Sequence, residues 1–114
     1  MSESVLSETA AETQFFAAYQ AVLLAARPVR QLVQHPEQVP VQALEPMRAF
    51  NLKAAAFVAL LPSTSQAQAW RVYLQEHLCR AEKVFAGAVD LLEAYQCFGY
   101  LHNGIVDAFD AATG

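Results

Sequence analysis

The hydrophobic and polar positions of residues 63–112 follow the spacing of one broad helical face. Apolar or aromatic side chains recur there at alternating intervals of four and three, and two histidines share the same row. The row consists of Trp70, Leu74, His77, Ala81, Val84, Ala88, Leu91, Tyr95, Phe98, His102, Ile105 and Phe109, widened by Leu78, Phe85, Leu92 and Val106. This pattern predicts one helix over about 65–111, which Gly87 weakens without ending. A break is possible at Asn103-Gly104, because both residues tolerate the left-handed conformation of helix ends.

A kinked helix is expected near the start of the chain. Thr9-Ala10-Ala11-Glu12 matches a capping box, in which the threonine and glutamate side chains satisfy free amides at a helix start. Apolar residues with helical spacing follow, so a helix over 9–34 is predicted, with a kink at Pro28. Residues 1–8 are polar and are expected to be flexible, and residues 9–112 are expected to form one domain.

A second helix is expected over about 40–61. The two prolines of His35–Pro40 mark the connector before it, and Pro62 ends its apolar pattern. Ser65-Gln66-Ala67-Gln68 then matches another capping box at the start of the long helix. The chain is therefore predicted to be all-α, with three principal helices.

Composition and helix length both favour a homodimer. Hydrophobic residues make up 55% of the 114 residues and charged residues 16%, against about a quarter charged in an average protein. So few charges leave apolar surface for another chain to cover. A continuous long helix would measure about 69 Å, and the two shorter helices, about 39 and 33 Å, would cover roughly half of it. A second copy is the simplest cover for the remainder, and the dimer is therefore preferred. If the long helix breaks near Gly87 or Asn103, a compact four-helix monomer is the alternative.

The charges argue against nucleic acid as a partner. The net charge is −4, with a pI near 5.2, whereas phosphate contacts require a basic surface. All seven lysines and arginines lie within residues 27–83, so both ends of the chain hold acidic residues without bases. We expect these acidic and basic segments to form ordinary solvent-exposed faces. The alternative is that acidic segments of one subunit pair with the basic segment of another.

A cytoplasmic protein is expected. The chain begins without a basic segment followed by an apolar one, so no secretory signal is predicted. The longest apolar run, Ala54–Leu61, is far shorter than the roughly 20 residues that span a bilayer. Cys79 and Cys97 would lie about 27 Å apart on a continuous helix, too far for a disulfide, and free thiols suit a reducing compartment.

The histidines suggest a ligand- or metal-binding sensor as an alternative function. In an antiparallel dimer centred between Val89 and Asp90, His77 of one copy would face His102 of the other. Trp70 and Tyr73 could add aromatic walls for a flat ligand such as haem. A metal site lacks further ligands at suitable spacing, so packing histidines are the preferred interpretation, and no metal or cofactor is expected.

Arg71-Val-Tyr-Leu-Gln-Glu-His77 resembles the Arg-x(4–6)-His signature of the HEPN ribonucleases over these seven residues. The resemblance implies a helical, dimeric ribonuclease in which Arg71 stabilises phosphate charge and His77 transfers a proton. Val72 departs from the polar residue usual after the arginine, and Arg30-x4-His35 fits the same spacing. A ribonuclease is therefore the second alternative.

A small non-enzymatic protein-binding module is the function that the sequence favours. An adaptor, a secretion-type chaperone, an inhibitor or an immunity protein would each bind through an apolar helical face. The face expected to contact the partner, with support from Tyr19 and Phe57, is the second half of the long helix. It consists of Leu91, Leu92, Tyr95, Phe98, Ile105, Val106 and Phe109.

Overall fold

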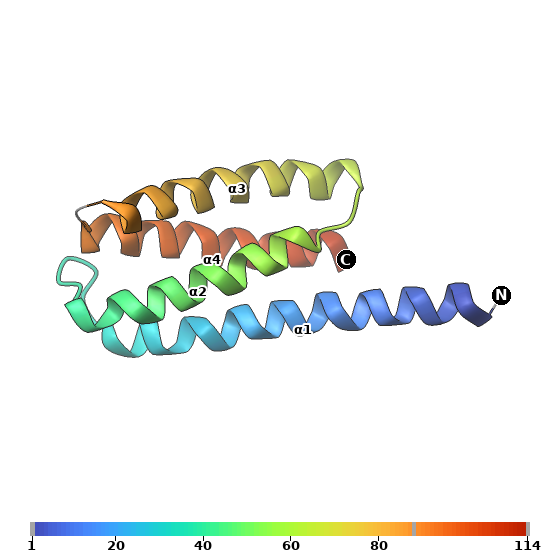
Figure 1. Cartoon of the computed structure of the whole chain (residues 1–114), viewed down its shortest axis with the longest axis horizontal. Coiled ribbons are helices and arrows are strands. Elements are labelled where there is room, and N and C mark those ends of the chain that lie inside the picture. The colour runs from blue at the N-terminus through green and yellow to red at the C-terminus, as the bar shows by residue number, and fades with distance from the viewer. Residues whose placement is uncertain (1, 88, 114) are drawn as a thin grey trace.

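The computed structural model describes residues 2–87 and 89–113, with side chains from Ala11 onward. Over these residues the chain forms four α-helices and one short 3-10 helix. They are α1 (Ser2–Leu32), η1 (Val41–Ala43), α2 (Leu44–Ala59), α3 (Ser65–Ala86) and α4 (Leu91–Thr113). The helices run alternately up and down the bundle (Figure 1). The prediction of an all-α fold is confirmed for the described residues, but the prediction of three principal helices is wrong.

The expected long helix folds back on itself between Ala86 and Leu91. The Asp90 carboxylate accepts hydrogen bonds from the backbone amides of Leu92 (3.0 Å) and Glu93 (3.2 Å), which caps the start of α4. The two halves of the predicted helix therefore pack as an antiparallel hairpin of α3 and α4. The length argument for a second copy no longer applies, and a homodimer stays a prediction without that support.

Gly104 lies inside α4, so the possible helix break at Asn103-Gly104 does not occur. A Cβ atom at Gly104 would lie 2.9 Å from Leu74 Cδ2 and 2.9 Å from Tyr73 Cε1. The glycine is therefore explained by the close approach of α3 to α4 rather than by a helix end.

The other helix boundaries differ modestly from the predicted ones. α1 begins at Ser2, before the predicted capping box, and continues through Pro28 without a break. The flexibility predicted for residues 1–8 stays a prediction. The 3-10 helix η1 occupies the expected start of the second helix, and α2 proper begins at Leu44. α3 is capped by Thr64 rather than Ser65, since the Thr64 hydroxyl accepts from the Ala67 amide at 3.2 Å.

The core lies where α2 and α4 cross the centre of the bundle. α1 packs mainly on α2, α3 packs mainly on α4, and α2 also contacts both α3 and α4. The largest fully buried side chains are Phe50, Phe57, Met47, Leu74, Leu101, Ile105, Val22, Val29 and Cys97. Phe50 meets Phe98 edge to face, with ring centroids 4.6 Å apart. The apolar stripe read from the sequence is therefore largely covered within one chain.

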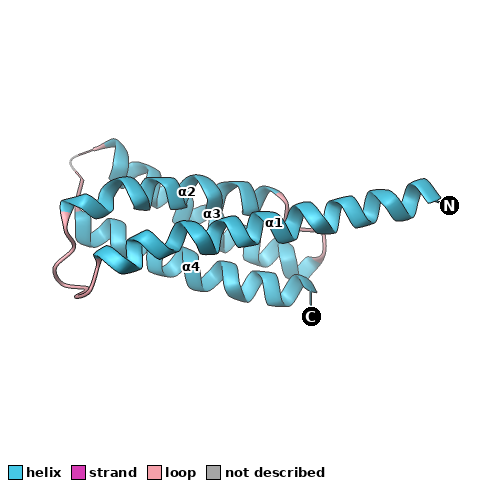
Figure 2. Ribbon diagram, turned by 90° about the horizontal axis from the view of Figure 1, so that it is seen from below, coloured by secondary structure: helices cyan, strands magenta, loops and turns pink. Residues whose placement is uncertain are grey.

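α1 is longer than its neighbours and extends beyond one end of the bundle (Figures 1 and 2). Its 31 residues span about 46 Å, whereas the 23 residues of α4 span about 34 Å. We call this end, formed by residues 2–16, 60–71 and 105–113, the open end. None of the helices described has an apolar stretch long enough to cross a membrane.

Candidate functional site: an apolar groove at the open end

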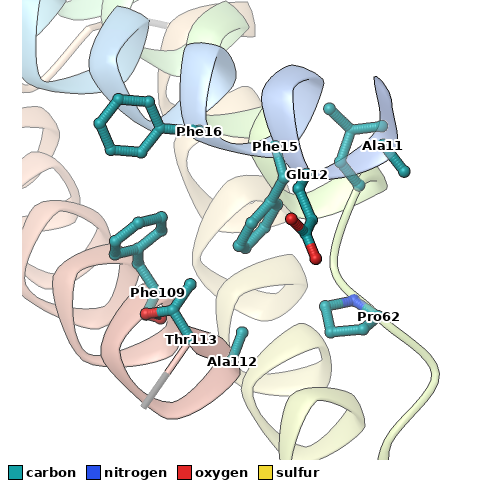
Figure 3. A pocket seen from close by; sticks show the side chains of 9 residues that line it. Ala11, Glu12, Phe15, Phe16, Pro62, Phe109, Ala112 and Thr113 are labelled. Carbon is teal, nitrogen blue, oxygen red and sulfur yellow. Dashed lines mark hydrogen bonds between the residues drawn. The ribbon is translucent and has the colours of Figure 1, made fainter. Parts of the chain in front are cut away.

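A groove of about 660 Å³ opens at this end between α1, the connection from α2 to α3, and the last turns of α4. We call it the end groove. Its lining consists of Ala11, Glu12, Phe15, Phe16, Leu60, Pro62, Phe109, Ala112 and Thr113. Figure 3 shows Phe15 and Glu12 reaching from α1 toward Phe109, Ala112 and Thr113 on α4. The small side chains of Ala11 and Ala112 leave the space that the larger ones border.

One wall of the end groove is part of a stacked aromatic cluster. Tyr19 and Phe109 are parallel, with ring centroids 3.9 Å apart and an interplanar angle of 2°. Phe15 stacks on Phe57 at 5.0 Å and on Phe109 at 5.6 Å. Each such pair contributes about 0.5–1.5 kcal/mol beyond its buried area. The cluster ties α1 to α2 and α4, so this wall is preorganised.

Two large apolar side chains of the groove remain in water. Phe16 is 50% exposed and Leu60 is 42% exposed, and the Phe16 ring centroid lies 6.1 Å from that of Phe109. Exposed apolar side chains that line one concave site are typical of a surface that another molecule covers. A ligand there would bury the free face of Phe16 without disturbing the core.

The groove is bordered by negative charge. Glu12 is exposed and belongs to the lining itself. Asp110 lies close enough to Tyr19 that its charge, together with burial of the phenol as the larger cause, raises the pKa of Tyr19. Arg71 lies at the same end, where its Nη2 donates a hydrogen bond to the Leu61 carbonyl. The lining itself holds no lysine or arginine.

The predicted partner-binding residues are divided between the core and the surface. Phe98 and Ile105 are buried within the chain and therefore cannot form a docking face in this fold. Leu91, Tyr95 and Phe109 are partly buried against the core, Val106 is half-buried, and Leu92 is exposed. Of these seven, Phe109 lines the end groove. The prediction treated one helical stripe as one surface, and the hairpin turned most of it inward.

Three of the four predicted ligand-binding residues come together on α3. Trp70 meets Tyr73 edge to face at 5.6 Å, and Tyr73 meets His77 at 4.7 Å. His77 then stacks on Tyr100 of α4, with ring centroids 5.0 Å apart. Burial, followed by the charge of Arg80, lowers the pKa of His77 against an opposing effect of Glu76. The row is an aromatic contact between α3 and α4.

His102, the fourth predicted ligand-binding residue, contacts a different part of the chain. Arg30 Nη2 lies 3.0 Å from both ring nitrogens of His102 and donates to whichever nitrogen is unprotonated. Burial, followed by the charge of Arg30, lowers the pKa of His102. Within the described residues, no three His, Cys, Asp or Glu side chains are grouped so that they could bind a metal ion.

Arg71 and His77 likewise contact different groups. The Arg71 guanidinium bonds the Leu61 carbonyl, whereas the His77 ring lies between Tyr73 and Tyr100. Residues six apart on a helix lie on different faces, so the two side chains do not converge on one position where a phosphate could bind. Both cysteines are free, Cys79 exposed and Cys97 buried, although the continuous helix used to predict this is absent.

The sequence predicts only part of the end groove. Phe109 is among the predicted partner-binding residues, with support from Tyr19 and Phe57, whereas Phe15, Phe16 and Leu60 are not. The double phenylalanine at 15–16 indicates a wide apolar stripe on this helix, because adjacent positions on a helix point about 100° apart. No protein family matches the chain, and comparisons with curated proteins and with solved structures find no significant match.

Proposed function

We propose that the chain is a non-enzymatic protein-binding module whose end groove receives an apolar helical face of another protein. The observation that supports this most directly is the half-exposed Phe16, which stands beside the stacked aromatic cluster and above an apolar groove. Exposed aromatic side chains on a rigid support are the usual centres of binding energy in protein interfaces.

The shape of the site favours a helix over a small molecule. A small-molecule site buries about 70–90% of its ligand, whereas this groove is open along α1 and leaves Phe16 and Leu60 in water. The first turns of α1 extend past the bundle, and a short helix without tertiary packing is marginal in water. A partner helix lying beside α1 would cover the groove and support these turns together.

Such a module fits the roles of adaptor, secretion-type chaperone, inhibitor or immunity protein, all of which act by covering a partner's apolar helix. We propose that it acts in the cytoplasm, since both of its thiols are free. Self-association into a homodimer belongs to the same proposal, through an exposed apolar surface outside the groove, such as the one around Leu92.

A set of three synthetic peptides tests the proposal. Each has roughly 18 residues, enough for five helical turns, with the same leucine row and with lysine, glutamine or glutamate at the polar positions. Calorimetric titration into the full chain measures affinity, and circular dichroism measures helix formation by the peptide. We expect at least one peptide to bind as a helix.

The Phe16→Ser variant and a matched control locate the binding site. Phe16→Ser should weaken that binding by about tenfold or more, the usual effect of removing a central aromatic contact. Leu52→Ser should leave it unchanged, because Leu52 is 74% exposed on α2 outside the groove. Absence of binding by all three peptides, or equal loss in the two variants, would refute the proposed function.

A further inference from the structure

We infer that the helix bound by the end groove is basic, an inference that rests on the proposed function. The first reason is the distribution of charge along the bundle. Among the residues whose side chains are described, Glu12, Asp107 and Asp110 lie at the open end against the single base Arg71. Residues 17–59 and 72–104, which form the remainder of the bundle, hold six acidic residues and six basic ones.

Of the six bases elsewhere in the bundle, two pair with acidic side chains among the described residues. Arg80 pairs with Glu93 at 3.3 Å, across the hairpin between α3 and α4. Arg48 pairs with Glu45 at 3.5 Å at the start of α2. The one base of the open end, Arg71, donates to the Leu61 carbonyl next to the groove rather than to an acidic side chain.

Two helix C-termini lie at the groove, and the N-terminus of α3 at Ser65, on the same end of the bundle, offsets part of their negative potential. α2 ends at Ala59, one residue before Leu60 in the groove lining, and the last residues of α4, Ala112 and Thr113, belong to the lining themselves. The carbonyls at a helix C-terminus behave as roughly half a negative charge. A lysine or arginine at the edge of a bound helix would meet these carbonyls as well as Glu12.

The same charges disfavour three other occupants. A second copy that pairs through this groove about a two-fold axis would bring Glu12 and Asp110 of both copies together. Nucleic acid and anionic lipid surfaces would be repelled in the same way. A basic amphipathic helix matches both the apolar floor and the acidic border.

The ranking of the three peptides tests this inference separately from the proposed function. At low salt we expect the lysine peptide to bind about tenfold more tightly than the glutamine peptide, with the glutamate peptide weakest. The advantage of lysine should shrink as salt is added, because partly exposed charges are screened. Equal affinity of the lysine and glutamine peptides would overturn the inference and leave the proposed function intact. If none of the three peptides binds, both the inference and the proposed function are refuted.

Charge-neutralising variants show whether the attraction is local. Glu12→Gln should reduce the preference for lysine over glutamine by about threefold, the scale of one partly exposed ion pair. Glu37→Gln removes the same charge from the exposed connection after α1, away from the groove, and should leave the preference unchanged. An equal effect of the two substitutions would mean that the overall charge attracts the peptide, and would also overturn the inference.

Discussion

Two glycines of α4 provide a sharp test of how α3 and α4 pack. Gly99 and Gly104 lie five residues apart in the same helix, but their surroundings differ. A Cβ atom at Gly99 would meet nothing within 4 Å, whereas one at Gly104 would lie 2.9 Å from side-chain atoms of Tyr73 and Leu74. Substituting each glycine by alanine therefore makes the same chemical change in an open place and in a closed one.

The expected stabilities follow from two opposing effects. Alanine favours a helix over glycine by about 1 kcal/mol, so Gly99→Ala should be more stable than the natural chain by about that amount. Gly104→Ala gains the same helix propensity, but its added methyl group overpacks the contact between α3 and α4. That overpacking costs about 1–3 kcal/mol. Leu74 is fully buried and cannot move aside, whereas the exposed Tyr73 ring can swing outward. We expect the two variants to differ by about 2 kcal/mol, with Gly104→Ala the less stable.

Urea unfolding followed by far-UV circular dichroism and by fluorescence of Trp70, the single tryptophan, measures the difference. Thermal melting should show it as well, at roughly 4 °C per kcal/mol. Trp70 lies against Tyr73, so its emission should change in folded Gly104→Ala and not in Gly99→Ala. Equal stabilisation by the two substitutions would refute the close α3–α4 approach and, with it, the hairpin.

Two further predictions concern the hairpin turn and the histidines. Asp90→Ala should lower the free energy of unfolding by about 1 kcal/mol in urea melts, because it removes the cap of α4, whereas Asp90→Asn should retain most of the stability. Stability should also fall as the pH drops below about 6.5, because the folded pKa values of His77 and His102 are lowered and the unfolded chain then binds protons more readily than the folded one. Urea melts at pH 7.5 and pH 5 should show a smaller loss for His77→Gln and for His102→Gln than for the exposed-loop control His35→Gln.

Periodicity identified the helices because their apolar rows are long and the connectors contain strong breakers. The prolines around residues 36–40 and Pro62 end helices where they were expected to, and the serine and threonine cluster caps α3 within one residue of the prediction. Prolines and capping residues act on their immediate neighbours in the chain, so their effects can be predicted from the sequence alone. The beginning of α1 was missed because the chain is helical before its capping box at Thr9.

The turn between α3 and α4 was missed although the sequence contains its start signal. Asp90 and Glu93 stand three apart before an apolar run, which is the pattern of a helix N-terminus. Gly87 by itself only lowers helix propensity, and Asp90 three residues later supplies the start of the next helix. A weak stop followed within three residues by a good start is stronger evidence for a break than either feature separately.

The apolar row of residues 70–109 is compatible both with one continuous helix and with a hairpin of two helices. Its residues are placed almost symmetrically about position 89, so the same row can pair with a second copy or, after a turn, with itself. His77 was expected to face His102 across a dimer, and in the folded chain it meets Tyr100, two residues away, within one molecule. The registers of the two arrangements are nearly the same, and in the folded chain Asp90 caps the second helix of the hairpin. No single helical stripe contains the groove beside Phe16, because the groove forms where α2 and α4 end beside α1.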